Sequence, residues 1–234
     1  MKLLRIKGLQ ENVCYRKPFM LKVYETYPLT PFSTIKGMLH TLLDATSYIP
    51  FDISIQGDYE ATYVDYQTHY LQKERSERIL LLNTDGLDVA VPKFPSKMLT
   101  QMPLYVHTLY KLELVFHIHA EDAVLSELYE RLGKFTAPLH LGRSEDLFRL
   151  DSVEFVDAEL NDVEDTLHTQ FVPIHEETLH YQGDLPIYRL PTHYTIKENR
   201  RIWTYALTKL VPAHSIHDDV YVDKDGYSVF LIKG

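Results

Sequence analysis

Cysteine, long apolar segments and glycine-rich motifs are scarce in this sequence. Its 234 residues contain one cysteine, Cys14, which excludes an internal disulfide and any zinc site built from several cysteines. No apolar run approaches the roughly 20 residues that a membrane-spanning helix needs. The first ten residues, MKLLRIKGLQ, hold no continuous apolar segment of the kind found in secretory signals. These absences predict a cytoplasmic globular protein.

The motifs of several enzyme classes are also missing. No Walker loop, dinucleotide-binding fingerprint or zinc-ligand spacing occurs, and Ser144 lacks the G-x-S-x-G context of a hydrolase nucleophile. His117 and His119 share one face of a predicted strand, a spacing that suits two metal ligands, but nothing fixes a third. A polar strand face explains them more simply. We therefore predict no catalytic residue, no metal and no cofactor.

Basic residues are outnumbered overall but unevenly distributed. The chain has 24 Lys and Arg against 33 Asp and Glu, a net charge of -9, which on average disfavours nucleic-acid binding. Residues 1–40, however, contain seven basic residues and two acids, whereas 151–185 contain ten acids and no Lys or Arg. Because the local potential governs binding, we expect one basic face and one acidic face that meets solvent or a protein neighbour.

Apolar patterning predicts an α+β fold. Apolar residues at strand spacing or at helical spacing predict, in chain order, a strand at 2–9, a helix within 28–45, short strands around Gly57-Asp58, a strand at 104–119, a helix at 121–134 and strands on both sides of residues 142–144. This is the order of a ferredoxin-like (RRM-like) β-α-β-β-α-β unit, assigned to residues 1–156. Residues 157–234 are expected to form an acidic connector and a small β-rich portion with a turn at Asp225-Gly226. Ser33 or Thr34 is expected to cap the first helix, and Gly133 to end the second.

Residues 67–104 interrupt this unit. Asp85-Gly86 between two apolar segments predicts a hairpin turn, and we expect this segment to project from the main sheet. Its KERSER sequence carries Lys73, Arg75 and Arg78. These side chains either form a solvated surface or contact a polyanion.

The segment Ser33-Thr34-Ile35-Lys36-Gly37 stands at the predicted start of the first helix. A helix N-terminus offers free N–H groups and a partial positive charge, both of which suit phosphate. Lys36 opposes the helix dipole there unless an anion is bound. Gly37 costs up to about 1 kcal/mol relative to alanine, which suggests a close backbone approach. We interpret the segment as a phosphate-binding element, with a plain capped core helix as the alternative.

Gly142-Arg143-Ser144 forms a tight break inside LHLGRSEDLFRLDSVEFV, residues 139–156. An ordinary turn explains the glycine and the serine, whereas a loop that closes over a phosphate explains all three residues. In a ferredoxin-like sheet such a loop would lie near the N-terminus of the first helix. Glu145 and Asp146 would then either orient Arg143 or cap the strand.

Two segments, PLTPFSTIKGMLHTLL and LHLGRSEDLFRLDSVEF, together resemble the CRISPR-associated RAMP superfamily, specifically its Cas-five family of type I Cascade subunits in a type I-B-like form. A proline-rich lead into S-T-I-K-G is shared by several RAMP proteins, and L-G-R-S-E-D is more specific to this family. The Tyr15-Arg16-Lys17 sequence and the hairpin at 67–104 also fit. The resemblance spans residues 1–156.

The resemblance implies a non-catalytic RNA-binding subunit in antiviral defence, with a ferredoxin-like palm and a hairpin thumb. Its partners would be the 5′ handle of the crRNA and the backbone and large subunits of Cascade, with target DNA reached only indirectly and no membrane. The RNA-binding residues would be Tyr15, Arg16, Lys17, Ser33, Thr34, Lys36, Gly37, Lys73, Arg75, Arg78, Gly142, Arg143 and Ser144.

The main alternative is catalytic. In one type I subtype a related protein cleaves precursor crRNA without metal, using a tyrosine, a lysine and a histidine. Such cleavage needs groups that activate a 2′-hydroxyl and protonate a leaving oxygen. His107 and Lys111 on the long strand are candidates, although no spacing fixes a triad. A protein-only scaffold subunit without RNA contact is a third hypothesis.

Overall fold

The fold is described from a computed structural model, which covers residues 1–72, 99–176, 179–180 and 184–234. These residues are mostly strands of one large antiparallel sheet, with two helices in the described ranges. Six elements confirm the predicted strand-helix-strand-strand-helix-strand order: β1 (Lys2–Val13), α1 (Phe32–Leu42), β3 (Asp52–Gln72), β4 (Leu99–His119), α2 (Asp122–Lys134) and β6 (Leu147–Val163). The four strands lie in the order β6-β1-β4-β3, and each neighbouring pair is antiparallel.

Strands from the second half of the chain extend this sheet at both edges. Beyond β3 lie β7 (Gln170–Pro173), β10 (Arg200–Val211) and β9 (Ile187–Lys197); beyond β6 lie β11 (Ile216–Asp223) and β12 (Ser228–Val229). Three two-residue strands pair off this path, namely β2 (Val23–Tyr24), β5 (Leu139–His140) and β8 (Leu179–His180). The boundary predicted near residue 156 falls inside β6, which pairs with β1 up to Asp157 and with β11 beyond it.

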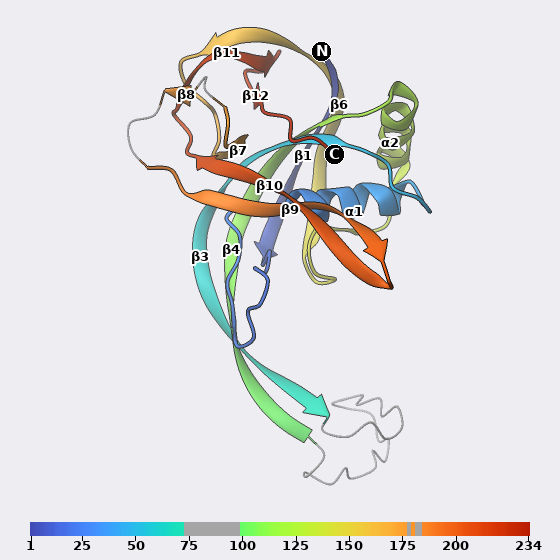
Figure 1. Cartoon of the computed structure of the whole chain (residues 1–234), viewed down its shortest axis with the longest axis vertical. Helices are drawn as coiled ribbons and strands as arrows, with labels where there is room; N and C mark the ends of the chain where they lie inside the picture. The colour runs from blue at the N-terminus through green and yellow to red at the C-terminus, as the bar shows by residue number, and fades with distance from the viewer. Residues whose placement is uncertain (73–98, 177–178, 181–183) are drawn as a thin grey trace.

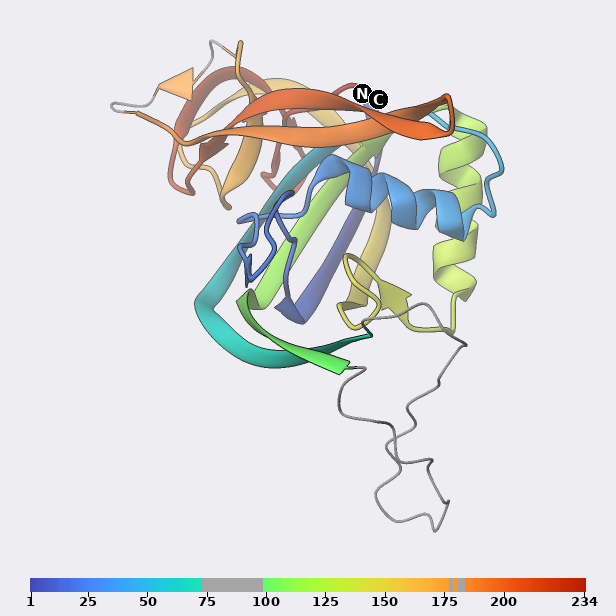
Figure 2. The same ribbon diagram turned by 60° about the horizontal axis from the view of Figure 1, so that its bottom comes forward.

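Both helices pack on one face of the central strands (Figures 1 and 2). Side chains of a strand alternate between its two faces, and the apolar face predicted for Val106 to Ile118 of β4 is confirmed from Leu112 onward; before Lys111, which has a φ of 48°, Leu109 joins the same core and Val106 belongs to a separate cluster. Leu112, Leu114, Phe116 and Ile118 are at most 1% exposed and belong to one core with apolar residues of both helices. On the opposite face, Arg5 of β1 lies beside His117 of β4. The sheet therefore has an apolar face towards the helices and buried polar groups behind it.

The first helix begins earlier than predicted. Its N-cap is Pro31, in an extended conformation with φ -67° and ψ 149°, so Ser33 and Thr34 are the second and third helical residues and neither is the cap. Phe32, the first helical residue, is fully buried. Packing of this ring, which sequence propensity does not encode, fixes where the helix starts.

Two glycines also differ from their predicted roles. Gly57 does not separate short strands, because β3 runs unbroken through it. A Cβ there would lie 2.1 Å from the carbonyl oxygen of Glu113, so the glycine permits close approach of the neighbouring strand. Gly133 does not end α2, which continues to Lys134 with Phe135 as its C-cap.

The paired strands β3 and β4 form an arm that leaves the body of the protein (Figure 1). Their ladder continues from Asp52 opposite His119 to Gln72 opposite Leu99. The last pair between β1 and β4 is Val13 with Leu109, so the far part of the arm extends past β1. The described ends of the predicted 67–104 hairpin are thus antiparallel strands. Its expected turn at Asp85-Gly86 and its basic residues Lys73, Arg75 and Arg78 lie outside the described residues.

Candidate functional site

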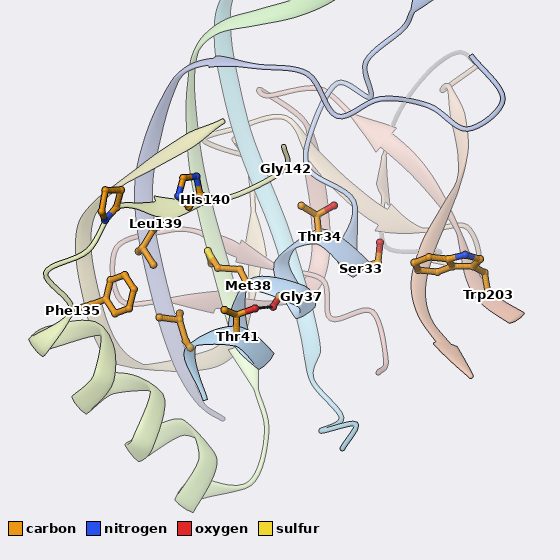
Figure 3. Close-up of a pocket in the computed structure, with 12 residues that line it drawn as sticks. Ser33, Thr34, Gly37, Met38, Thr41, Phe135, Leu139, His140, Gly142 and Trp203 are labelled. Carbon is orange, nitrogen blue, oxygen red and sulfur yellow. Dashed lines mark hydrogen bonds between the residues drawn. The ribbon is translucent and has the colours of Figure 1, made fainter. Parts of the chain in front are cut away.

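The N-terminal half of α1 lies between two cavities. The first has a volume of about 530 Å³ and is bounded by α1, the segment that follows α2, and β10. Figure 3 shows its lining: Ser33, Thr34, Gly37, Met38, Thr41, Leu42, Phe135, Pro138, Leu139, His140, Gly142 and Trp203. Gly142 shares this cavity with Ser33, Thr34 and Gly37, so the predicted proximity of the Gly142 loop to the start of the first helix is confirmed.

The second cavity, of about 470 Å³, lies between α1, the segment that follows it, and the β9–β10 hairpin. Its lining is Ser33, Lys36, Gly37, His40, Ala45, Thr46, Ser47, Tyr48, Thr192, His193, Tyr194, Ile196 and Trp203. Ser33, Gly37 and Trp203 line both cavities. The two cavities therefore flank one strip of α1.

The N-terminus of α1 is electrostatically open. Pro31 offers no side-chain cap, and the first turn contains no acidic residue. The uncompensated N–H groups leave a partial positive charge at this end of the helix. Gly37 sits one turn further along, and within the described part of the chain no atom comes within 4 Å of where its Cβ would be. The close approach suggested for Gly37 is therefore not made by this chain.

Lys36 is the most unusual residue of the site. Its position on the inner side of α1 leaves it only 3% exposed. Among the residues that the structure describes, its Nζ atom has no hydrogen-bond partner. Burial lowers the pKa of the ammonium to about 8, against the opposing effect of the Asp52 carboxylate. The lysine expected to bind phosphate is therefore a buried charge on the wall of the second cavity, with no hydrogen-bonded counter-ion in the described part of the chain.

A row of rings forms another wall of this cavity. His40 packs edge-on against Phe51, stacks on Tyr48 at 5.6 Å between ring centroids, and Tyr48 in turn contacts His193 at 5.0 Å. The Nδ1 atom of His40 lies 2.7 Å from the Lys36 carbonyl oxygen, and its Nε2 atom accepts from the Ile49 N–H at 2.9 Å. Those contacts assign His40 as the neutral Nδ1–H tautomer, with neither nitrogen free for proton transfer.

The β9–β10 hairpin supplies aromatic and basic side chains that the sequence prediction missed. Trp203 is 37% exposed and meets Tyr194 edge to face at 5.2 Å. The Arg201 guanidinium lies 4.6 Å from the centre of the Tyr194 ring. Exposed aromatic rings interleaved with arginines suit single-stranded nucleic acid, because bases stack on the rings. The sequence RRIWTY contains this pattern, but only the fold places it beside α1.

Arg143 does not point a free guanidinium at the first cavity. Its Nε and Nη2 atoms bind the two Asp146 oxygens at 3.0 and 2.8 Å, and Nη1 binds Glu145 at 3.0 Å. Asp146 is fully buried and also accepts from the Arg143 backbone N–H. The expected orientation of Arg143 by both acids is confirmed. Because these bonds close the loop on itself, the arginine supports the shape of the loop.

Gln10 of β1 ties this loop to the sheet. Its Nε2 atom donates to the carbonyl oxygens of Leu141, Asp146 and Leu147 at 2.9–3.3 Å. The Oε1 atom of the same side chain accepts from the Tyr15 hydroxyl. Tyr15 is 3% exposed, so its ring is not available for stacking on RNA. Tyr15 supports the loop through Gln10, whose side chain it binds.

Arg16, Lys17 and Ser144 lie nearer the surface. The Arg16 guanidinium lies 3.7 Å from the centre of the Tyr24 ring and donates to the Met20 carbonyl oxygen. Lys17 pairs with Glu25 at 3.1 Å, and the Ser144 hydroxyl donates to Glu145 at 3.1 Å. None of the three lines the two cavities around α1.

His117 and His119 do not share a site. His117 is fully buried and its Nε2 atom lies 3.1 Å from Asp223, which also binds Arg5 at 2.5 Å. His119 is exposed and lies 3.8 Å from Asp52. Within the described ranges, no group of three or more His, Cys, Asp or Glu side chains is placed to hold a metal ion. His117 is accounted for by the polar cluster around Asp223.

The catalytic pair suggested by sequence is not brought together. Lys111 forms an exposed ion pair with Glu60 at 3.0 Å. His107 lies opposite Val64 on the arm. Neither residue lines the cavities beside α1.

None of the helices in the described part of the chain is long and apolar enough to cross a membrane.

Comparison with known proteins agrees with the resemblance in the sequence. No curated protein matches this chain. A chain of a CRISPR RNA-guided surveillance complex has a similar fold, with a TM-score of 0.51 at 12% identity, over 92% of this chain and 91% of that one. A CRISPR protein from Archaeoglobus fulgidus matches over 100% of both chains at 10% identity and a TM-score of 0.48. The family model described as CRISPR-associated protein (Cas_Cas5) matches residues 4–205. The chain therefore belongs to the Cas-five family of CRISPR-associated proteins.

Proposed function

We propose that this protein is a non-catalytic RNA-binding subunit of a type I CRISPR Cascade complex, in a type I-B-like form, and that it holds the 5′ handle of the crRNA. One observation carries the proposal beyond family membership. The uncapped start of α1, the Gly142 loop, the buried ammonium of Lys36 and the aromatic hairpin around Trp203 meet at two adjoining cavities. Single-stranded RNA is bound by such combinations of phosphate contacts and aromatic stacking.

In this proposal the strands β6-β1-β4-β3 with α1 and α2 form a ferredoxin-like palm, and the β3–β4 arm is the base of the thumb. The RNA backbone passes the N-terminus of α1, where the helix charge favours phosphate. Gly142 and Ser144 contribute through the loop surface, and Arg143 and Tyr15 act by holding that surface in shape. Arg16 and Lys17 extend the basic surface at the end of β1. The backbone and large Cascade subunits are the expected protein neighbours.

RNA binding by the purified protein tests this proposal. Labelled single-stranded RNA of the CRISPR repeat should bind with an affinity that falls steeply with salt. For a single strand, the slope of log K against log salt is about -0.7 per phosphate contact. A repeat RNA of scrambled sequence is the control. If neither RNA binds and the protein joins its complex equally well without RNA, a protein-only scaffold role replaces the proposal.

Endoribonuclease activity is the second candidate. Lys36, Tyr48 and His193 line one cavity, and burial together with the Lys36 charge lowers the pKa of His193. A histidine with a lowered pKa beside a lysine whose pKa is lowered to about 8 suits general acid–base chemistry. Incubation of repeat-containing RNA with the protein in EDTA separates the two functions. Specific cleavage within the repeat would establish the enzyme and overturn the non-catalytic assignment.

A further inference from the structure

An unpaired buried charge needs an explanation. Burying an ammonium without a counter-ion is costly, because the lost hydration is not replaced. The Lys36 side chain is covered by the protein, yet no described group accepts a hydrogen bond from its Nζ atom. Lys36 is one of the residues that line the second cavity. An anion in the cavity would supply the missing counter-charge.

The other titratable groups around Lys36 do not supply it. Asp52 of β3 acts on Lys36 through its charge but makes no hydrogen bond with it among the described contacts. His40 of α1 is a neutral tautomer that donates to the Lys36 carbonyl oxygen, not to the ammonium. His193 of β9 has its pKa lowered by burial and then by Lys36 itself. Burial, followed by the Asp52 charge, raises the pKa of Tyr48, which therefore stays neutral at physiological pH.

The volume and the lining of the cavity indicate which class of anion fits it. Its volume of about 470 Å³ falls in the range of small-ligand sites, roughly 300–1,000 Å³. The lining includes the hydroxyl-bearing residues Ser33 and Ser47 and the partly exposed Trp203, whereas the hydroxyl of the lining residue Thr192 already donates to the Thr204 carbonyl oxygen at 3.2 Å. Hydroxyls and an ammonium suit a phosphate, and an exposed indole suits a base. The lining therefore fits a phosphate joined to an aromatic base.

We propose that the cavity between α1 and the β9–β10 hairpin takes up one nucleotide of the bound RNA, with its phosphate on Lys36 and its base against Trp203. This inference rests on the RNA-binding function proposed above and assigns the nucleotide pocket within it. Trp203 also borders the first cavity, so the same ring marks the point at which the RNA strand passes from one cavity to the other.

Proton uptake follows from this geometry. The pKa of free Lys36 is about 8, and a phosphate beside the ammonium raises that pKa in the complex. RNA binding above pH 8 therefore requires a proton from solvent, so affinity falls as pH rises. With a free pKa of about 8, the protonated fraction falls about tenfold between pH 7 and pH 9. The dissociation constant should rise by the same factor.

Lys36→Met tests the phosphate contact. In RNA-binding titrations with the labelled repeat RNA, K36M should weaken binding about tenfold or more at pH 7, since a charge-assisted hydrogen bond is lost. It should also abolish the pH dependence between pH 7 and 9 and reduce the salt slope by about 0.7. Lys224→Met is the matched control, because Lys224 is exposed at the β11–β12 turn and pairs with Glu154. K224M should match the wild type in affinity and pH dependence.

Trp203→Ala tests the base contact and does not depend on a buried residue. Stacking of a base on an aromatic side chain contributes to RNA binding, so W203A should lower the RNA affinity by about fivefold or more. Trp203→Phe should recover most of it, and Tyr221→Ala on β11, an equally exposed ring, should change nothing.

The outcomes separate this inference from the proposed function. Wild-type binding that is unchanged in K36M and W203A overturns the nucleotide pocket while leaving RNA binding in place. Absence of wild-type binding overturns both. Loss in K36M with W203A unaffected would leave an anion site for phosphate alone and remove the base from the proposal.

Discussion

Within the residues that the structure describes, two basic side chains, Arg5 and Lys36, are buried on opposite faces of the central sheet, and their surroundings differ. Arg5 is 2% exposed and its guanidinium contacts three carboxylates, Asp223 and Asp225 at 2.5 Å and Glu154 at 3.3 Å. Lys36 is 3% exposed, and within the described chain its ammonium has no partner. The terminal nitrogens of Arg5 thus bind three carboxylates, although its Nε has no hydrogen-bond partner among the described residues, whereas no described carboxylate binds the Lys36 ammonium. The contrast is consistent with a scaffold role for Arg5 and supports the proposal that Lys36 binds an anion of the RNA.

Arg5→Met should have the largest effect on stability. Although burial alone raises the pKa of the Asp223 carboxyl, the His117, Tyr227 and Arg5 hydrogen bonds hold that pKa well below its usual value. Removing Arg5 leaves the buried Asp223 carboxylate without its cationic partner, which costs about 3–5 kcal/mol of unfolding free energy. Urea unfolding measures the loss. Lys7→Met is the control, because Lys7 donates to the Tyr227 hydroxyl and holds no buried acid. Equal stability of R5M and K7M would contradict a scaffold role for Arg5.

Asp146→Ala should have the next largest effect and should lower the free energy of unfolding by about 2–3 kcal/mol. The buried Asp146 carboxylate accepts from the Arg143 backbone N–H and from two guanidinium nitrogens. Its loss opens the Gly142 loop, so urea unfolding and RNA affinity should both decline. Glu145→Ala removes only an exposed partner of Arg143 and should cost less than about 1 kcal/mol. If D146A and E145A behave alike, the loop is not held by the buried acid.

Lys36→Met should change stability in the opposite direction. Replacing an unpaired buried ammonium by an apolar side chain of similar length is expected to stabilise the protein by about 1–3 kcal/mol at pH 7. Below pH 8 the lysine is protonated in both states, so the folded protein carries the full burial cost. Between the folded pKa of about 8 and the ordinary lysine pKa of 10.5, the folded state loses its proton while the unfolded state keeps it.

Wild-type stability should therefore rise with pH across that window relative to K36M. The difference in unfolding free energy between K36M and the wild type therefore becomes smaller, and parallel urea titrations at pH 7 and pH 10 measure the change. Groups that do not interact with Lys36 contribute equally to the pH dependence of both proteins and cancel in the difference. Destabilisation by K36M at pH 7 would mean that Lys36 has a structural partner, and the contrast with Arg5 would be lost.

Local patterning predicted much of this fold, and its failures have one cause. The alternation in β4 and the helical spacing in α2 depend on neighbours in sequence, so both elements were predicted. The burial of Lys36 depends on residues 45–48 and 192–196, and the latter lie more than 150 positions away in the chain. The sequence placed Lys36 in the first helix but not on its covered side. Trp203 was missed for the same reason, since only the packing of β9 and β10 across α1 gives it a role.

The β7 and β8 strands were not predicted either, because the many acids of 151–185 conceal short apolar pairs such as Phe171-Val172. The prediction for Asp146 was correct in part. Its role in orienting Arg143 followed from adjacency, whereas its complete burial required the loop to fold back over Gln10. Local chemistry was therefore predictable at this site, and the covering of each group by distant strands was not.

Gly37→Ala should produce the smallest change and separates stability from binding most sharply. Alanine in a helix interior is favoured over glycine by about 0.5–1 kcal/mol, and within the described part of the chain no atom obstructs the new methyl group. Gly133→Ala in α2 is a matched control, since its Cβ position is equally open among the described residues. Both variants should gain similar stability in urea unfolding. Only G37A places a methyl group at the border of both cavities, so only G37A should weaken RNA binding, by a few-fold. Equal RNA affinity in the two variants would show that the strand does not cross α1 at Gly37, and would move the bound RNA away from Lys36.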